Sequence, residues 1–243
     1  MATLRFVRRA LTFGLVGVLL ATGCGGDDGG GASAENTATT PDTQTAATAA
    51  AASDACRRVP APAPRPEGGR RRPPAANLDP DRRYGVTFWT NCGRFTIQVD
   101  QEAAPATAAS FVALARKGFF DGTVFHRIVP GFVIQGGDPT GSGQGGPGYT
   151  TTDKPPADTV YERGMVAMAK TGAEPSGTAG SQFFVVTGQA PGLAPEYATL
   201  GRVSKGLPVV ERIGRLGDPA SGGAGTPVEP VVIRKTKVSA AGG

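Results

Sequence analysis

The sequence predicts a mainly β protein whose strands form a closed β-barrel, with two α-helices capping its ends. Two observations carry this prediction. Many short segments alternate between apolar and polar residues, whereas only two segments have the apolar spacing of a helix. The chain has 243 residues, and about the last 160 of them are apolar enough to bury one core.

The predicted fold opens with a β-hairpin. Apolar and polar residues alternate over residues 86–88 and again over residues 95–99. The turn-forming sequence Asn91-Cys92-Gly93 separates the two runs. This pattern is typical of antiparallel strands joined by a tight turn.

A helix is predicted directly after the hairpin. Pro105 stands at its start, Arg116 and Lys117 lie in its last turn, and Gly118 follows. Each residue type is favoured at that position of a helix. A second, shorter helix is predicted at residues 207–216, where apolar residues recur at helical spacing.

Further strands are predicted downstream of the first helix. Short apolar runs indicate them at residues 164–169, 182–186, 199–203 and 228–238. The Gly- and Pro-rich segment 139–148 is expected to form an ordered surface loop.

The first 23 residues are typical of a secretory signal peptide. Arginines precede an apolar run at residues 10–21, which is too short to span a membrane comfortably. Small residues then lead to Cys24, as in a bacterial lipobox, so Cys24 is a candidate for lipidation. Several acyl chains on one cysteine would anchor a protein firmly. The alternative is ordinary signal cleavage beside an incidental cysteine.

Residues 24–80 are expected to form a flexible linker. Gly, Ala, Thr, Pro and Arg dominate them, and such a composition cannot offset the entropy of ordering the chain. Arg65 and Arg70–Arg72 are the clearest basic cluster in a chain of net charge +5. Such a run either binds phosphates or remains solvated. No aromatic residue stands among these arginines to stack on bases, so no nucleic-acid partner is expected.

Two further cysteines follow, Cys56 and Cys92. In an exported protein they can form a disulfide, which would tie the end of the linker to the first hairpin. The alternative is two unpaired thiols.

The sequence lacks the usual residue sets for covalent or metal catalysis. His126 is the single histidine, whereas a zinc site needs several His or Cys ligands. Ser181 lacks the nucleophile-elbow pattern, and the Gly-rich stretch 136–146 lacks the Lys-Ser/Thr of a phosphate loop. No metal or other cofactor is therefore expected. Arg127, set in an otherwise apolar run, suits a reaction in which no bond is made or broken.

Three ordered blocks resemble the cyclophilin-type peptidyl-prolyl isomerases. They are FHRIVPGFVIQGGD at 125–138, GMVAMA at 164–169 and GSQFFVVT at 180–187. The resemblance covers about residues 84–240. It implies a closed antiparallel eight-stranded β-barrel capped by two α-helices, with residues 81–243 as the isomerase domain.

The resemblance also implies a site. Arg127 matches the catalytic arginine of the family, and Lys170 replaces an asparagine that is common in it. Gly192 and Tyr197 stand where many eukaryotic members have tryptophan and histidine. His126 is expected to be structural and to point away from Arg127 if both lie in one strand. The residues implied to bind substrate are Phe132, Val133, Gln135, Ala169, Lys170, Thr171, Gln182, Phe184, Leu193 and Tyr197.

The implied activity is cis-trans isomerisation of X-Pro bonds in exported proteins, without cofactor or covalent intermediate, in support of their folding. The expected partners are proline-containing segments of unfolded or exported proteins and, through the lipid anchor, the outer side of the cell membrane. We expect a monomer. Secretion as a soluble protein is the alternative location. Two other functions stay open: a binding module of the same fold with little turnover, and a basic surface protein that binds anionic polymer through residues 65–72.

Overall fold

The computed structural model describes residues 55–67, 69, 71–188 and 192–242. The predicted signal peptide and Cys24 lie outside the described residues. The part that is described belongs to one compact unit. Among its helices, none is both long and apolar enough to cross a membrane.

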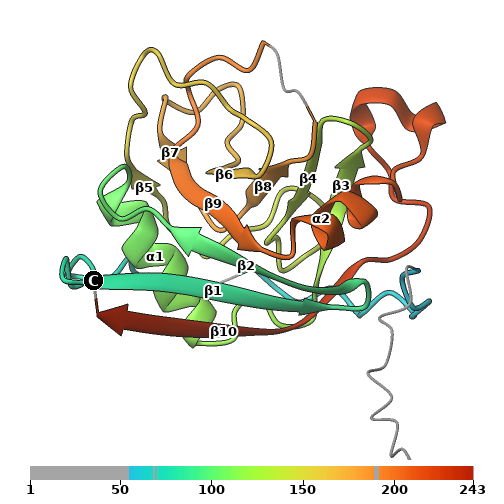
Figure 1. Cartoon of the computed structure of the whole chain (residues 1–243), viewed down its shortest axis with the longest axis horizontal. Helices are drawn as coiled ribbons and strands as arrows, with labels where there is room; N and C mark the ends of the chain where they lie inside the picture. The colour runs from blue at the N-terminus through green and yellow to red at the C-terminus, as the bar shows by residue number, and fades with distance from the viewer. Residues whose placement is uncertain (1–54, 68, 70, 189–191, 243) are drawn as a thin grey trace, which may run out of the picture. The chain divides into compact units, whose positions relative to one another are not determined.

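Eight strands close into an antiparallel barrel, as the sequence predicts (Figure 1). Around the barrel the order is β1, β10, β3, β4, β8, β6, β9 and β2. The strands are β1 (Arg82–Thr90), β2 (Gly93–Val99), β3 (Thr123–Val129), β4 (Val133–Gly136), β6 (Met165–Met168), β8 (Phe183–Val186), β9 (Thr199–Lys205) and β10 (Val232–Gly242).

The first two strands form the predicted hairpin. Val86 pairs with Ile97 and Phe88 with Phe95, and all four side chains are buried. The rings of Phe88 and Phe95 stack with their centroids 5.1 Å apart. Alternation along each strand therefore directs one face of the hairpin into the barrel.

Two helices flank the barrel. Helix α1 (Pro105–Arg116) packs against β1, β5 and β10, and helix α2 (Leu207–Gly214) packs against β2, β3 and β4 (Figure 1). The N-terminus of α1 is held by the carboxylate of Asp153, which accepts a 2.7 Å hydrogen bond from the backbone N–H of Thr107. A carboxylate satisfies the free N–H groups at a helix start and favours the positive end of its dipole.

Aromatic rings fill the interior of the barrel. Phe111 of α1 meets Phe183 of β8 edge to face, at 5.5 Å between centroids. Because side chains fill the barrel, a ligand site has to lie on its outer surface. The fully buried phenylalanines are Phe88, Phe95, Phe111, Phe120, Phe125 and Phe183.

Several elements were not predicted individually. The block at residues 125–138 contains most of β3, a turn and β4. A separate two-stranded sheet pairs β5 (Thr151–Thr152) with β7 (Thr178–Ala179), and a 3₁₀ segment, η1, spans Pro219–Ala224. Segments of two residues carry too little pattern to be recognised in a sequence.

The predicted flexible linker differs from the structure over its second half. Residues 55–67 and 71–81, which we name the strap, follow the barrel without forming a helix or a strand before β1. Cys56 and Leu78 pack against the hydrophobic core, and Cys56 forms a disulfide with Cys92. Composition predicted disorder there, but covalent and apolar anchors that composition does not reveal hold the strap in place. Residues 24–54 of the predicted linker lie outside the described residues.

Candidate active site

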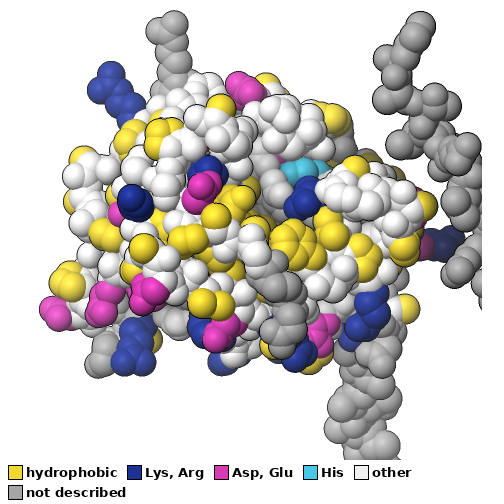
Figure 2. All heavy atoms as spheres, turned by 90° about the horizontal axis from the view of Figure 1, so that it is seen from above, with side chains coloured by type: hydrophobic (Ala, Val, Ile, Leu, Met, Phe, Trp, Pro, Cys, Tyr) yellow, Lys and Arg dark blue, Asp and Glu magenta, His cyan; other side chains and the backbone are white. Residues whose placement is uncertain are grey.

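A cavity of about 260 Å³ lies on the outer side of β4, β6 and β8. Figure 2 shows hydrophobic side chains that reach the surface near the middle of one face, with basic and acidic side chains beside them. We name this cavity the proline pocket, because the resemblance to cyclophilins implies that the residues lining it bind the substrate proline. Its lining residues are Arg127, Phe132, Val133, Gln135, Ala169, Lys170, Phe184, Leu193 and Tyr197.

Strand alternation produces the floor of the proline pocket. Phe183 and Val185 of β8 belong to the barrel core, whereas Phe184 and Val186 belong to a second apolar cluster that also contains Val133 and Ala167. Successive side chains of a strand point to opposite faces. The run Phe-Phe-Val-Val, buried throughout, therefore serves the core and the pocket at once.

The aromatic wall of the pocket is braced from behind. The ring of Tyr197 meets Phe184 edge to face at 5.3 Å and Tyr161 at 5.9 Å. The hydroxyl of Tyr161 donates a 2.8 Å hydrogen bond to the carbonyl of Tyr197 and accepts one of 2.9 Å from its N–H. Burial raises the pKa of Tyr161, so the hydroxyl stays neutral and can serve as donor and acceptor.

The guanidinium at the pocket is held from a distant segment. Nε of Arg127 donates a 3.1 Å hydrogen bond to the carbonyl of Gly223 in η1. The N–H of Ile128 donates one of 2.7 Å to the carbonyl of Gly225, which has φ = 66°. With Nε engaged, the two terminal nitrogens of Arg127 are the donors available to a ligand.

Two glutamine side chains link the pocket to the glycine-rich loop at residues 139–148. Nε2 of Gln182 donates to the carbonyls of Gly143 and Gly145, at 3.0 and 2.9 Å. Its Oε1 accepts a 3.0 Å bond from Nε2 of Gln135. The amide of Gln182 is thereby used within the protein, and the carbonyl oxygen of Gln135 is the acceptor left to the pocket.

Asp138 orders the same loop. Its carboxylate accepts hydrogen bonds from the N–H and hydroxyl of Thr140 and from the N–H groups of Gly143 and Gly145. Burial alone would raise the pKa of Asp138, but these hydrogen bonds together lower it below its ordinary value.

Lys170 enters the pocket wall as half of an ion pair. Its side chain is 3% exposed, and Nζ lies 2.9 Å from the carboxylate of Glu196, which is 51% exposed. Nζ also lies 5.7 Å from the ring centroid of Tyr197. The carboxylate of Glu196 thus balances the charge of Lys170 within the pocket wall, and the ammonium also makes a cation–π contact with the ring of Tyr197.

His126 lies beside the loop and does not line the proline pocket. A Cβ built on Gly143 would lie 3.6 Å from Cδ2 of the imidazole. Burial lowers the pKa of His126, with the charge of Arg127 acting in the same direction and that of Asp138 against it. A neutral, partly buried imidazole fits the structural role expected from the sequence.

The structure brings most of the predicted site residues together. Arg127 and eight of the predicted substrate-binding residues line the proline pocket. Thr171 and Gln182 line a neighbouring cavity instead. The sequence did not predict a role for Tyr161 or for the two glycines behind Arg127, Gly223 and Gly225. The run Gly222-Gly223-Ala224-Gly225 was the one feature of the sequence that marked these glycines.

Comparison with known proteins identifies the family of this chain. The family model described as cyclophilin type peptidyl-prolyl cis-trans isomerase/CLD matches residues 85–238. Peptidyl-prolyl cis-trans isomerase-like 1 of Aspergillus oryzae is 37% identical over 157 residues, which are 63% of this chain and 94% of the relative. Peptidyl-prolyl cis-trans isomerase A of Mycobacterium tuberculosis is 38% identical over 172 residues, covering 63% of this chain and 91% of the relative.

A solved structure shares the fold as well. The crystal structure of a cyclophilin-type peptidyl-prolyl cis-trans isomerase from Cryptosporidium parvum superimposes with a TM-score of 0.58 at 31% identity, over 65% of this chain and 98% of the other. A second structure of that protein, determined in the presence of the dipeptide Ala-Pro, gives a TM-score of 0.57 at 31% identity, over 64% of this chain and 98% of the other.

The closed barrel and these relatives define a protein that binds proline-containing peptides. The chain belongs to the cyclophilin-type peptidyl-prolyl cis-trans isomerase family, and it is a peptidyl-prolyl cis-trans isomerase.

Proposed function

We propose that Arg127 is the catalytic group and that the proline pocket holds the substrate ring. The observation that carries this assignment is a guanidinium fixed through Nε at an apolar, aromatic-walled cavity. Rotation about a peptide C–N bond costs about 18–20 kcal/mol, because amide resonance is lost. The prolyl nitrogen of the twisted bond becomes a better hydrogen-bond acceptor than that of the planar bond. A donor aimed at this nitrogen therefore binds the transition state more tightly than either ground state.

The remaining pocket residues restrain the two ends of the rotating bond. Phe132, Phe184 and Leu193 hold the pyrrolidine ring, while the carbonyl oxygen of Gln135 accepts from the flanking peptide backbone. The edge at Ala169 lies beside this acceptor in the pocket wall. Rotation about the C–N bond makes and breaks no covalent bond, so the reaction needs no proton transfer from the enzyme, and Arg127 contributes a rigid fork of N–H donors.

We further propose that the isomerase is exported and held at the outer side of the cell membrane through lipidated Cys24, where it assists the folding of exported proteins. The basic and apolar N-terminal regions, followed by Cys24, support this location. The Cys56–Cys92 disulfide supports it as well, because structural disulfides persist in oxidising compartments.

Expression of the full chain in a bacterial host tests the location. The wild-type protein should fractionate with membranes and incorporate labelled fatty acid, and Cys24→Ala should abolish both properties. Cys56→Ala is the matched control and should keep the label. Exported but unlabelled wild-type protein would instead support soluble secretion, and retention in the cytosol would refute export.

A further inference from the structure

A second cavity adjoins the proline pocket. Its volume is about 460 Å³, and it shares Gln135, Ala169 and Lys170 with the proline pocket. A peptide whose proline occupies one cavity must therefore place a flanking residue at or beside the other. Most of the second cavity is built by the barrel and its loops, but Glu67 comes from the strap.

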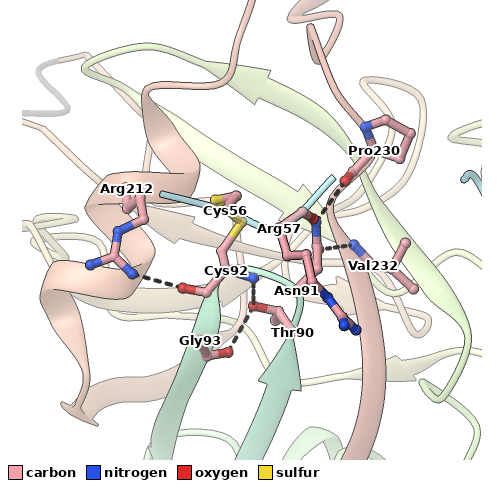
Figure 3. Close-up of a disulfide and its surroundings, with 9 residues drawn as sticks. All are labelled: Cys56, Arg57, Thr90, Asn91, Cys92, Gly93, Arg212, Pro230 and Val232. Carbon is pink, nitrogen blue, oxygen red and sulfur yellow. Dashed lines mark hydrogen bonds between the residues drawn. A yellow bond between two sulfur atoms is a disulfide. The ribbon is translucent and has the colours of Figure 1, made fainter. Parts of the chain in front are cut away.

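The strap is fixed to the barrel at its start. Cys56 is bonded to Cys92 in the turn between β1 and β2 (Figure 3). Next to it, the N–H of Arg57 donates a 2.9 Å hydrogen bond to the carbonyl of Asn91, and Nδ2 of Asn91 returns one of 2.8 Å to the carbonyl of Arg57. Asn91 also bonds Pro230 and Val232 (Figure 3), so the strap and the start of β10 share one anchor.

A second anchor lies just before Glu67. The N–H of Arg65 donates a 3.0 Å hydrogen bond to the carbonyl of Pro139, at the start of the glycine-rich loop. The Arg65 guanidinium bonds the carbonyl of Phe119 and lies 6.0 Å from the centroid of that ring, and the guanidinium of Arg71 lies 5.1 Å from it. Cation–π contacts on both sides of Glu67 therefore fix the stretch of strap that carries it.

The charges of the second cavity are unbalanced. Its ionisable side chains include two carboxylates, Glu67 and Glu174. The one ammonium, that of Lys170, is already paired with Glu196 at 2.9 Å. The carboxylate of Glu174 accepts a 2.6 Å hydrogen bond from the N–H of Thr171, whereas Glu67 is exposed. The side chains that line the cavity therefore carry net negative charge, whereas the guanidiniums of Arg65 and Arg71 lie at Phe119, outside that lining.

We propose that Glu67 is a specificity-determining residue supplied by the strap, which makes the enzyme prefer peptides with Lys or Arg near the proline. An exposed pair of opposite charges contributes little, about 0.2–1 kcal/mol, which corresponds to roughly a 1.4- to 5-fold change in an equilibrium or rate ratio. The preference is thus modest and weakens as salt screens the charges.

The test compares kcat/KM for proline peptides that differ only in carrying Lys, norleucine or Glu at each position within two residues of the proline. Glu67→Gln should lower the Lys-to-norleucine ratio by about 1.4- to 5-fold at the responsive position and leave the norleucine peptide unchanged. Glu67→Lys should reverse the order of the Lys and Glu peptides. Glu102→Gln, a change of another exposed carboxylate that lines a different cavity, is the matched control. Equal ratios in wild type and Glu67→Gln would overturn the proposal.

A second arm tests whether the strap positions the carboxylate. In the Cys56→Ser/Cys92→Ser double variant, the first anchor is lost, and the Lys preference should fall toward that of Glu67→Gln while turnover of the norleucine peptide persists. Adding Glu67→Gln to this variant should lower the preference little further. A double variant that keeps the full Lys preference would refute the positioning role of the disulfide-anchored strap.

Discussion

Replacing Arg127 by alanine removes the guanidinium that we propose acts as the donor to the prolyl nitrogen. A hydrogen bond from a charged group contributes about 1.5–3 kcal/mol. At about 1.4 kcal/mol per tenfold change in rate, its loss should lower kcat/KM roughly 10- to 150-fold. Peptide affinity should change far less, because the apolar walls formed by Phe132, Phe184 and Leu193 remain in place.

The assay therefore measures two quantities on the same variants. Catalysed isomerisation of a proline peptide gives kcat/KM, and calorimetric titration with that peptide gives Kd. Arg127→Lys is the informative second variant: it keeps the charge but loses the planar fork and the Nε–H that bonds the carbonyl of Gly223. We expect it to recover only a small part of the lost rate. Arg94→Ala, at an exposed position of β2, is the control and should behave as wild type.

The result that would refute this reasoning is specific. If Arg127→Ala kept kcat/KM within about twofold of wild type, differential binding by the guanidinium would not drive the reaction. If instead kcat/KM and affinity fell in parallel, the arginine would bind ground and transition states alike. Only a fall in turnover with affinity retained supports a donor that acts on the twisted bond. That outcome would also separate an enzyme from a binding module of the same fold.

Three further predictions concern the support of the site and the fold. Gly225→Ala should lower kcat/KM several-fold because its φ is +66° and a Cβ would lie 2.9 Å from Cγ of Arg127; Gly223→Ala, whose Cβ meets nothing within 4 Å, should not. Intact-mass measurement should show Cys56 and Cys92 as a disulfide, and Cys→Ser changes at both should lower the free energy of unfolding by about 2–4 kcal/mol; two free thiols in exported protein would contradict the pairing. Because burial lowers the pKa of His126 below 6.5 in the folded state, protonation favours unfolding. Stability in urea should thus fall as pH drops below about 6.5, and His126→Gln should flatten that part of the profile; an unchanged slope in the variant would count against this assignment.

The sequence predicts the site well in β8, where the alternation of side chains along one strand supplies both the barrel core and the proline pocket. In Phe183-Phe184-Val185-Val186, alternate residues enter the barrel core and the proline pocket. These four residues lie within the block at residues 180–187 that resembles cyclophilins. A strand slipped by one residue would exchange the two faces. Register, once fixed by the core, therefore fixes the pocket as well.

The support of Arg127 could not be predicted in the same way. Gly223 stands 96 positions away along the chain and contributes only a carbonyl group, which every residue type possesses. Tyr161 likewise acts through a hydroxyl that contacts backbone atoms. Contacts to backbone leave no complementary residue type in the sequence, so only the folded geometry reveals them.

The strap illustrates a different gap between composition and structure. Its Pro- and Arg-rich sequence has too few apolar residues to offset the entropy of ordering by burial alone. In the structure, a disulfide and cation–π contacts on Phe119 stand in for the missing apolar surface. The disulfide reduces the freedom of the unfolded chain, and prolines reduce it further, so ordering the strap costs less than its composition suggests. The disulfide thereby helps to hold the strap where Glu67 lines the second cavity, which links the specificity proposed for Glu67 to the oxidising compartment proposed for the enzyme.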